Sequence, residues 1–234
     1  MALEVHQLSK TFNSSIAVDN ISFTIKMGEV VGFLGPNGAG KSTTIKMIIG
    51  FLKADKGVVT LNGLTYDKDE VSYKKMIGYL PESNPLYEDM FVKEYLYFIA
   101  AGHEIKNPTE RIQEVIAQTG LELMQTKKIH QLSKGYKQRL GMAAAIIHAP
   151  LLLLLDEPTA GLDPNQLIEI RTLIKSLSAH SMILFSTHIL QEVTAICDRV
   201  LVLNKGKLVA DDTLYALSQK HETGLEEIFK ILTL

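Results

Sequence analysis

The sequence predicts an α/β fold: a mostly parallel sheet, an antiparallel β part at the N-terminus and an inserted α-helical subdomain. Continuous apolar runs occur at residues 30–34, 151–155 and 182–185. Such runs are typical of strands that are buried on both faces of a parallel sheet. Residues 3–5 and 21–25 instead have apolar side chains at every second position, as half-buried antiparallel strands do. Residues 86–150, between the first two apolar runs, follow a mostly helical pattern.

Shorter signals predict the remaining strands and turns. Residues 58–61 are a short apolar stretch before Asn62-Gly63, a dipeptide typical of hairpin turns. Residues 199–210 resemble a final hairpin that turns at residues 204–206.

Helices are expected where apolar residues recur three or four positions apart. They are predicted over residues 42–50, 92–101, 109–119, 137–148 and 165–178. Three of these form the inserted subdomain, roughly residues 86–150. The tail, roughly residues 212–234, ends in an amphipathic helix with Leu225, Ile228, Phe229 and Leu232 on one face. We therefore expect residues 1–234 to form a single domain.

The composition excludes several classes of protein. The 234 residues are 46% hydrophobic with a formal net charge of -2, which excludes disorder of the bulk chain and argues against a nucleic-acid partner. Cys197 is the single cysteine, so no intrachain disulfide can form and a cytosolic compartment is favoured. No apolar run approaches the ~18 residues of a membrane-spanning helix.

A glycine-rich loop follows the first apolar run. Residues 35–42 read Gly-Pro-Asn-Gly-Ala-Gly-Lys-Ser and fit the Walker A pattern, with a strand before it and a helix after it. The glycines let backbone N–H groups approach phosphates, and the helix N-terminus favours negative charge. A tight turn ending in a surface lysine would not require all these residues together. The loop therefore predicts a P-loop NTPase core that binds ATP.

Each residue of the loop has an expected role. Lys41 contacts the β- and γ-phosphates, Ser42 offers its hydroxyl to Mg²⁺ and Thr43 adds a phosphate contact. The expected nucleotide-binding residues of the loop are Gly35, Pro36, Asn37, Gly38, Ala39, Gly40, Lys41, Ser42 and Thr43.

The second apolar run ends in two carboxylates, Asp156 and Glu157. A Walker B aspartate at such a strand end helps to hold Mg²⁺, and we assign this role to Asp156. Glu157 can polarise an attacking water, since a general base must lie within about 3 Å of the proton it takes, directly or through one water. A strand followed by an acidic turn at Pro158 is the alternative reading.

Three further segments lie in a fixed order around these carboxylates. Residues 132–139 precede them, residues 160–163 follow them, and residues 186–188 end the next apolar strand. The order of these motifs resembles the ATP-binding cassette (ABC) ATPases, and the resemblance covers essentially the whole chain. Within that family, Glu82 together with the Lys-Gly-Tyr of residues 134–136 resembles the ABC-2 type exporters, including the gliding-motility-like branch.

The family signature is usually Leu-Ser-Gly-Gly-Gln, and here residues 132–136 read Leu-Ser-Lys-Gly-Tyr. Ser133 can cap the helix that follows it, and Gly135 allows a close backbone approach. The resemblance implies that both residues complete the ATP site of a second subunit packed head to tail. An ordinary capped helix is the alternative.

Three more residues receive roles from the resemblance. His188 matches the switch histidine that contacts the γ-phosphate, and Asp163 matches the D-loop aspartate that communicates across the dimer. Phe12 occupies the place of the aromatic residue that stacks on adenine. Each also has a structural alternative: a strand-end histidine, an acid at a helix N-terminus, and a core phenylalanine.

The family usually has a glutamine after a strand like residues 77–81, where this chain has Glu82. A glutamate would offer Mg²⁺ a charged oxygen in place of a neutral one. We expect Glu82 to be a metal-side ligand, with Ser42 and Asp156.

The resemblance implies an ATPase subunit, with Lys41, Glu157 and His188 as catalytic residues. Its implied partners are a second copy, as a homodimer, and an integral membrane permease that docks near residues 82–102. The implied location is cytoplasmic, on the cytoplasmic face of the cell membrane. The substrate and the direction of transport are not readable from this chain.

Other ABC ATPases act without transport. Chromosome and DNA-repair types carry a long coiled coil between Walker A and the signature, for which this chain has no room. A soluble ATPase of the iron–sulfur assembly type remains the alternative. A P-loop kinase would leave the signature and His188 unexplained.

Overall fold

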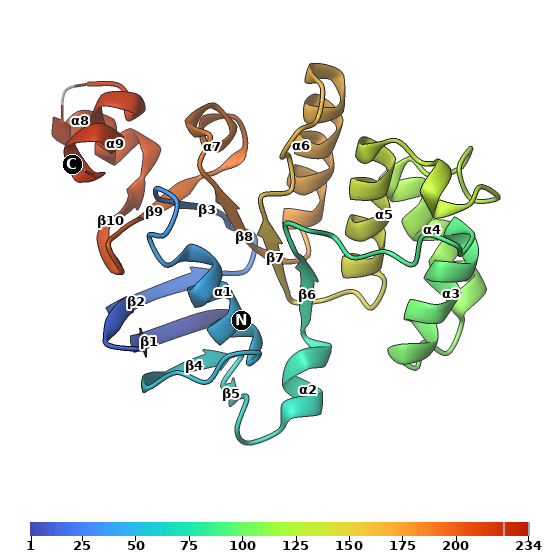
Figure 1. Cartoon of the computed structure of the whole chain (residues 1–234), viewed down its shortest axis with the longest axis horizontal. Helices are drawn as coiled ribbons and strands as arrows, with labels where there is room; N and C mark the ends of the chain where they lie inside the picture. Colours follow the sequence, from blue (N-terminus) through green and yellow to red (C-terminus); the bar gives the residue numbers. More distant parts are fainter. Residues whose placement is uncertain (222, 234) are drawn as a thin grey trace.

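The computed structural model describes residues 1–221 and 223–233, which form two sheets with helices around them (Figure 1). The smaller sheet has four strands in the order β2-β1-β4-β5, and every pairing in it is antiparallel. Its strands are β1 (Ala2–Phe12), β2 (Ser15–Lys26), β4 (Lys56–Leu61) and β5 (Leu64–Thr65). The predicted antiparallel N-terminal part is confirmed.

The larger sheet has six strands in the order β10-β9-β3-β8-β7-β6. Five of them run parallel, and β10 is an antiparallel edge strand. The strands are β3 (Val30–Leu34), β6 (Ile77–Leu80), β7 (Leu152–Asp156), β8 (Met182–Thr187), β9 (Arg199–Asn204) and β10 (Lys207–Thr213). The continuous apolar runs are therefore the central strands of a mostly parallel sheet, as predicted.

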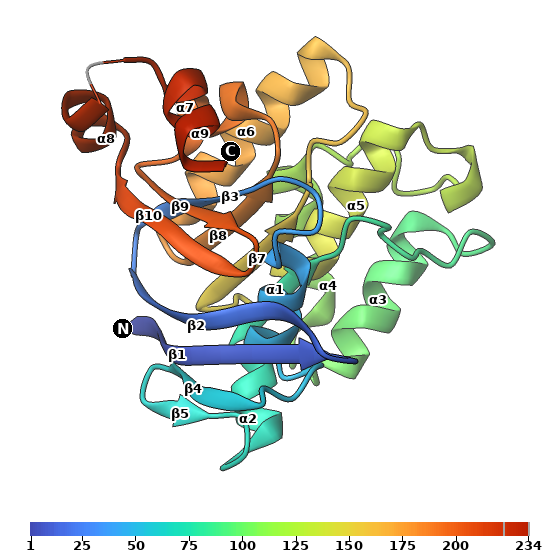
Figure 2. The ribbon, with the colours of Figure 1, turned by 60° about the vertical axis from the view of Figure 1, so that its left-hand side comes forward.

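Both faces of this sheet are covered by other parts of the protein. Strand β7 shows why such a strand is apolar up to its last residue, Asp156. Leu152 and Leu154 belong to the core between the two sheets, whereas Leu153 and Leu155 belong to the core on the opposite face. The first core also contains Ile45 and Ile48 of α1 (Lys41–Ile49), which lies between the sheets in Figure 2. Side chains alternate along a strand, so a strand covered on both sides needs apolar residues at every position.

The inserted subdomain lies beside β6 in Figure 1 and is helical, as predicted. It comprises α3 (Val92–Gly102), α4 (Pro108–Thr119), the short 3₁₀ helix η1 (Ile129–Gln131) and α5 (Lys134–Ile146). Helix α6 (Pro164–Ser178) connects β7 to β8. The chain ends in α8 (Leu214–His221) and α9 (Leu225–Thr233), whose Ile228 is buried.

Some boundaries differ from the predictions. Helix α5 begins at Lys134 rather than at residue 137, because the Ser133 side chain accepts a hydrogen bond from the backbone N–H of Tyr136. The tail begins later than expected, because β10 extends to Thr213. Two short helices were not predicted: α2 (Glu70–Lys75), capped by Asp69, and α7 (Leu190–Ile196).

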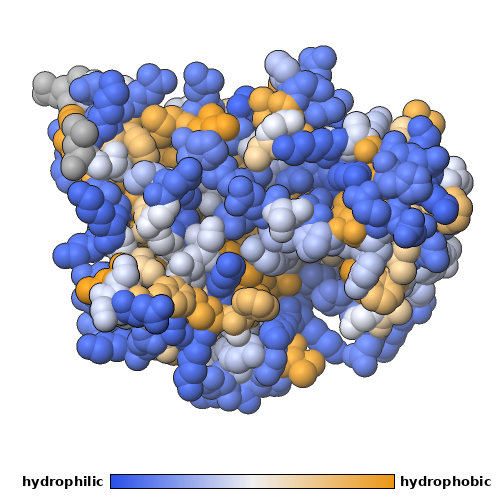
Figure 3. Space-filling view, viewed as in Figure 1, coloured by the Kyte–Doolittle hydropathy of each residue, from blue (hydrophilic) through white to orange (hydrophobic). Residues whose placement is uncertain are grey.

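The face drawn in Figure 3 is mainly hydrophilic, with its hydrophobic side chains in separate small patches. In the described part of the chain, no helix is both long enough and apolar enough to cross a membrane.

Candidate active site

The glycine-rich loop lies between β3 and α1, as the sequence predicts for a phosphate-binding loop. Gly38 and Gly40 have φ angles of 79° and 107°, which side chains with a Cβ rarely adopt. A Cβ on Gly40 would also collide with the carbonyl oxygen of Ala17, and one on Gly35 with that of Leu203. The loop geometry therefore requires glycine at these positions.

Lys41 is the first residue of α1 and is 8% exposed. Its Nζ donates hydrogen bonds to the carbonyl oxygens of Gly35 at 2.7 Å and Pro36 at 3.3 Å. Burial lowers the pKa of Lys41, and the nearby carboxylates oppose this shift. The ammonium is thus held inside the loop, in a position where an anion would compensate its charge.

The first N–H groups of α1 have no capping side chain, because the N-cap residue is Gly40. Unpaired N–H groups at a helix start form a favourable site for phosphate. This donor set, together with Lys41, fits the phosphates of a nucleotide.

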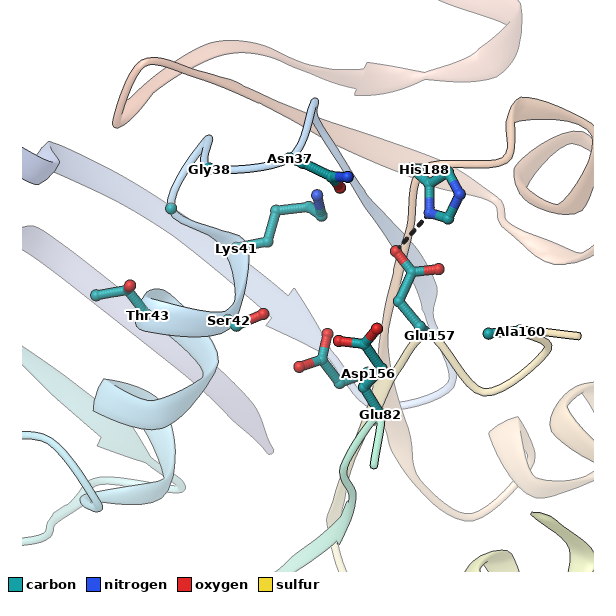
Figure 4. A pocket seen from close by; sticks show the side chains of 11 residues that line it. Asn37, Gly38, Lys41, Ser42, Thr43, Glu82, Asp156, Glu157, Ala160 and His188 are labelled. Atoms are coloured by element: carbon teal, nitrogen blue, oxygen red, sulfur yellow. Dashed lines mark hydrogen bonds and ion pairs between the residues drawn. The ribbon is translucent and has the colours of Figure 1, made fainter. Parts of the chain in front are cut away.

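The carboxylates lie opposite the loop, at the carboxyl ends of β6 and β7 (Figure 4). Asp156 is 4% exposed and is the last residue of β7, and Glu82 follows β6. Figure 4 shows both carboxylates close together, with the hydroxyl of Ser42 directed toward them. Thr43 lies on the other side of the first turn of α1.

Glu157 and His188 form a direct contact between two segments that are distant in sequence. The Nδ1 of His188 lies 2.9 Å from Oε1 of Glu157. The other carboxylate oxygen of Glu157, Oε2, is buried and has no hydrogen-bond partner among the described residues. A buried polar atom almost always has a partner, so Oε2 is an unused acceptor on a residue that lines the pocket described next.

One pocket of about 240 Å³ brings these groups together. Its lining includes most of the loop and the carboxylates that follow β6 and β7. It also includes Ala160, the first residue of the 160–163 segment, for which no role was predicted. The lining residues are Asn37, Gly38, Gly40, Lys41, Ser42, Thr43, Glu82, Asp156, Glu157, Ala160 and His188.

The pocket also fits Mg²⁺ when a nucleotide is present. Within residues 1–221 and 223–233, no three acidic, histidine or cysteine side chains are grouped so as to hold a metal ion by themselves. Mg²⁺ commonly binds through one or two carboxylates together with substrate phosphates. Ser42, Asp156 and Glu82 supply that kind of incomplete oxygen donor set.

Seven predicted residues do not line this pocket, and three of them, Gly35, Pro36 and Ala39, belong to the glycine-rich loop itself. Phe12 is 45% exposed at the end of β1, with the Nζ of Lys10 lying 5.6 Å from its ring centre. Ser133 caps α5, and Gly135 packs so closely on Gln166 that a Cβ would collide with it.

Asp163 also lies outside the pocket. Its side chain accepts hydrogen bonds from the N–H groups of Asn165 and Gln166, so it caps α6. Asp163 is therefore the acid at a helix N-terminus that the structural alternative describes, and it is exposed.

The fold and the site together define a P-loop nucleotide-binding protein. A family model described as "ABC transporter" matches residues 18–160, which is more than half of the chain. The chain therefore belongs to the ABC transporter family, as an ATP-binding subunit.

Relatives and solved structures agree with this assignment. The uncharacterized ABC transporter ATP-binding protein YdbJ of Bacillus subtilis is 38% identical, over 97% of this chain and 74% of the relative. The bacitracin transport ATP-binding protein BcrA of Bacillus licheniformis is 36% identical, over 96% of this chain and 74% of the relative. A solved ATP-binding subunit of an ABC transporter superposes with a TM-score of 0.90 at 30% identity, covering 99% of both chains.

Proposed function

We propose that this protein hydrolyses ATP and thereby powers a separate membrane permease, through ATP-driven head-to-tail dimerisation. The observation that carries the proposal is the contact between the buried Glu157 and the exposed His188, which lie in one pocket with the phosphate loop. Glu157 keeps one carboxylate oxygen without a partner in the described protein, while its other oxygen lies 2.9 Å from Nδ1 of His188. That arrangement suits a group that orients and deprotonates an attacking water.

The proposed reaction is in-line attack of a water on the γ-phosphate, in which the bond from the γ-phosphorus to the bridging oxygen breaks and ADP leaves. Glu157 accepts the proton of the water, and Lys41 and His188 stabilise the charge on the transferring phosphoryl group. Ser42, Asp156 and Glu82 would hold Mg²⁺, which when bound neutralises charge on the phosphate oxygens.

We place the adenine against Phe12, which lies near the loop. Phe12 pairs with Ser15 across the β1–β2 hairpin, and Ala17 a little further along β2 packs against Gly40. An exposed ring at this place can stack on a base.

The dimer part of the proposal rests on residues that lie outside their own pocket. Ser133 and Asp163 are both exposed, and Ser133 is the N-cap residue of helix α5. In a head-to-tail dimer, Ser133 and Gly135 would complete the ATP site of the second copy. Two copies would then enclose two nucleotides, and hydrolysis would reopen them.

The permease would dock on residues 82–102, and the protein would lie on the cytoplasmic face of the cell membrane. Three aromatic side chains of this segment are 45–56% exposed: Tyr87, Phe91 and Phe98. Tyr95 is 6% exposed and belongs to the core. Glu82, the Lys-Gly-Tyr signature and the transport role printed in the name of BcrA favour a subunit of an ABC-2 type exporter.

Phosphate release from ATP and Mg²⁺ tests the catalytic part. We expect Glu157→Gln to lower kcat by at least about 100-fold, while ATP binding persists because the phosphate loop is unchanged. Glu110→Gln, the same change on an exposed residue of α4, is the matched control and should match wild type. Equal rates for Glu157→Gln and wild type would contradict the assignment.

Membrane fractionation tests the transport part. The protein should sediment with membranes only when the membrane protein encoded beside it is co-expressed. Continued solubility in the presence of that protein would instead favour the assembly-type alternative.

A further inference from the structure

A second contact, deeper in the protein, joins the same two segments that carry Glu157 and His188. The carboxylate of Glu192, on α7, is 1% exposed and accepts two hydrogen bonds on Oε2. The donors are the hydroxyl of Thr159 at 2.5 Å and that of Thr187 at 3.0 Å. Thr159 and Thr187 are themselves 2% and 0% exposed.

The positions of the two threonines place this contact next to Glu157 and His188 in the sequence. Thr159 lies two residues after Glu157, and Thr187 immediately precedes His188. Glu192 therefore ties together the loop after β7 and the end of β8, which are the two segments that present the proposed base and the proposed switch histidine.

Local hydrogen bonds transmit the position of each threonine to its neighbour. The hydroxyl of Thr187 also accepts a bond from the backbone N–H of Ile189 at 3.0 Å, so the backbone on both sides of His188 is fixed. On the other segment, the N–H of Ala160 donates to the carbonyl of Glu157 at 3.2 Å, and Glu157 has a φ of 50°. This tight turn leaves little freedom between Thr159 and Glu157.

Packing alone does not explain a carboxylate at this position. Burying a charge is costly unless it is hydrogen-bonded, and an apolar residue of similar size would avoid that cost. Oε1 of Glu192 has no partner among the described residues, nor does the hydroxyl of Ser186, which precedes Thr187. The described protein thus keeps an incompletely satisfied carboxylate where it can bind both hydroxyls.

We propose that Glu192 is a positioning residue, which holds Thr159 and Thr187 so that Glu157 and His188 stay aligned for hydrolysis. This inference rests on the proposed function, because it assigns Glu192 a role in the same reaction. Glu192 does not line the pocket, so its effect passes through the two threonines.

Steady-state ATPase kinetics test the proposal with three variants. We expect Glu192→Ala to lower kcat by about 10-fold or more with KM for ATP within about 3-fold, since small misplacements of reacting groups reduce rate strongly. Glu192→Gln keeps a carbonyl oxygen that can accept both hydroxyls, so it should recover kcat to within about 3-fold of wild type. Thr159→Val removes one of the two hydrogen bonds to Glu192 and should give a kcat between those of wild type and Glu192→Ala.

Thr194→Val is the control, because Thr194 is exposed on the same helix and bonds only to its own helix backbone. Melting temperatures measured for every variant separate positioning from folding. A kcat of Glu192→Ala or Thr159→Val equal to that of wild type would overturn the inference. The inference would also be overturned if activity fell in all three variants in proportion to the loss of folded protein and Glu192→Gln recovered none of it.

Phosphate release by the wild-type protein distinguishes failure of the proposed function from failure of the proposed role of Glu192. If wild type releases no phosphate, the proposed function itself fails. If wild type is active and the three variants match the control, only the role of Glu192 fails.

Discussion

Two histidines lie at opposite ends of the large sheet, and their surroundings differ in almost every respect. His188 follows β8 at the carboxyl ends of the parallel strands, its side chain is 54% exposed, and it contacts the carboxylate of Glu157. His148 precedes β7 at the amino ends, where its Nε2 lies 3.0 Å from the carbonyl oxygen of Ile77. The rings of His148 and His103 stack with centroids 3.9 Å apart and an interplanar angle of 3°.

The charged and titratable groups around the two histidines also differ. Burial lowers the pKa of His148 to about 4, with smaller contributions from His103 and Arg111. His148 is therefore neutral near pH 7 and acts as a packing group. His188 instead shares a pocket with Lys41 and two buried carboxylates.

The comparison shows that position in the sheet, more than residue type, decides what a histidine can do. In open α/β sheets, ligands bind at the carboxyl ends of the strands. The start of α1 lies at that end of the sheet, beside the carboxylates that follow β6 and β7.

The largest effect should come from Lys41→Ala at the carboxyl end. Removing the buried ammonium deletes the cation expected at the β- and γ-phosphates, so phosphate release should fall by about 1,000-fold. Lys74→Ala removes an exposed lysine paired with Glu70 and serves as the control. A phosphate-release assay in which Lys41→Ala retained wild-type activity would remove the basis for a phosphate loop here.

A smaller effect on rate should separate the two histidines directly. We expect His188→Ala to reduce kcat by about 100-fold, as for loss of a group that acts on the reacting atoms. His148→Gln should leave kcat within about 2-fold of wild type, because its pocket is separate from the nucleotide pocket. Equal losses in phosphate-release assays of the two variants would show that the contrast between the two ends is wrong.

The smallest effect concerns stability and is expected at the amino end only. The folded pKa of His148 lies below its ordinary value of 6.5, so the unfolded chain binds more protons between about pH 4 and about pH 6.5. Stability from this group is therefore lost as the pH falls through that range. Wild type should lose about 2 kcal/mol through His148 between about pH 7 and about pH 5.

Urea unfolding at the two pH values measures this loss. His148→Gln should flatten the dependence of stability on pH. An unaltered slope in His148→Gln would mean that His148 does not titrate abnormally.

Much of the fold and of the phosphate site could be predicted from sequence, because their signals are local. The Gly35–Ser42 loop and the strand that ends at Asp156 are each encoded by consecutive residues, and both contribute to the lining of one pocket. Apolar runs identified the central strands, but not their order in the sheet, which depends on packing between distant segments.

The remaining features could not be predicted because they depend on contacts between distant residues. Thr159 and Glu192 are 33 positions apart, and no local pattern links them. Helix α7, which carries Glu192, has only seven residues, too few for a periodic pattern to be distinguished. Asp163 shows a further limit, since one side chain can satisfy a family motif and cap a helix at once.

The central claim is that the carboxyl-end site binds ATP and is completed by a second copy. Size-exclusion chromatography with light scattering on Glu157→Gln, with saturating ATP and Mg²⁺, tests it most directly. We predict a stable dimer that returns to monomer when Lys41→Ala is added to the same chain. A Glu157→Gln protein that remained monomeric while ATP was bound would contradict the account.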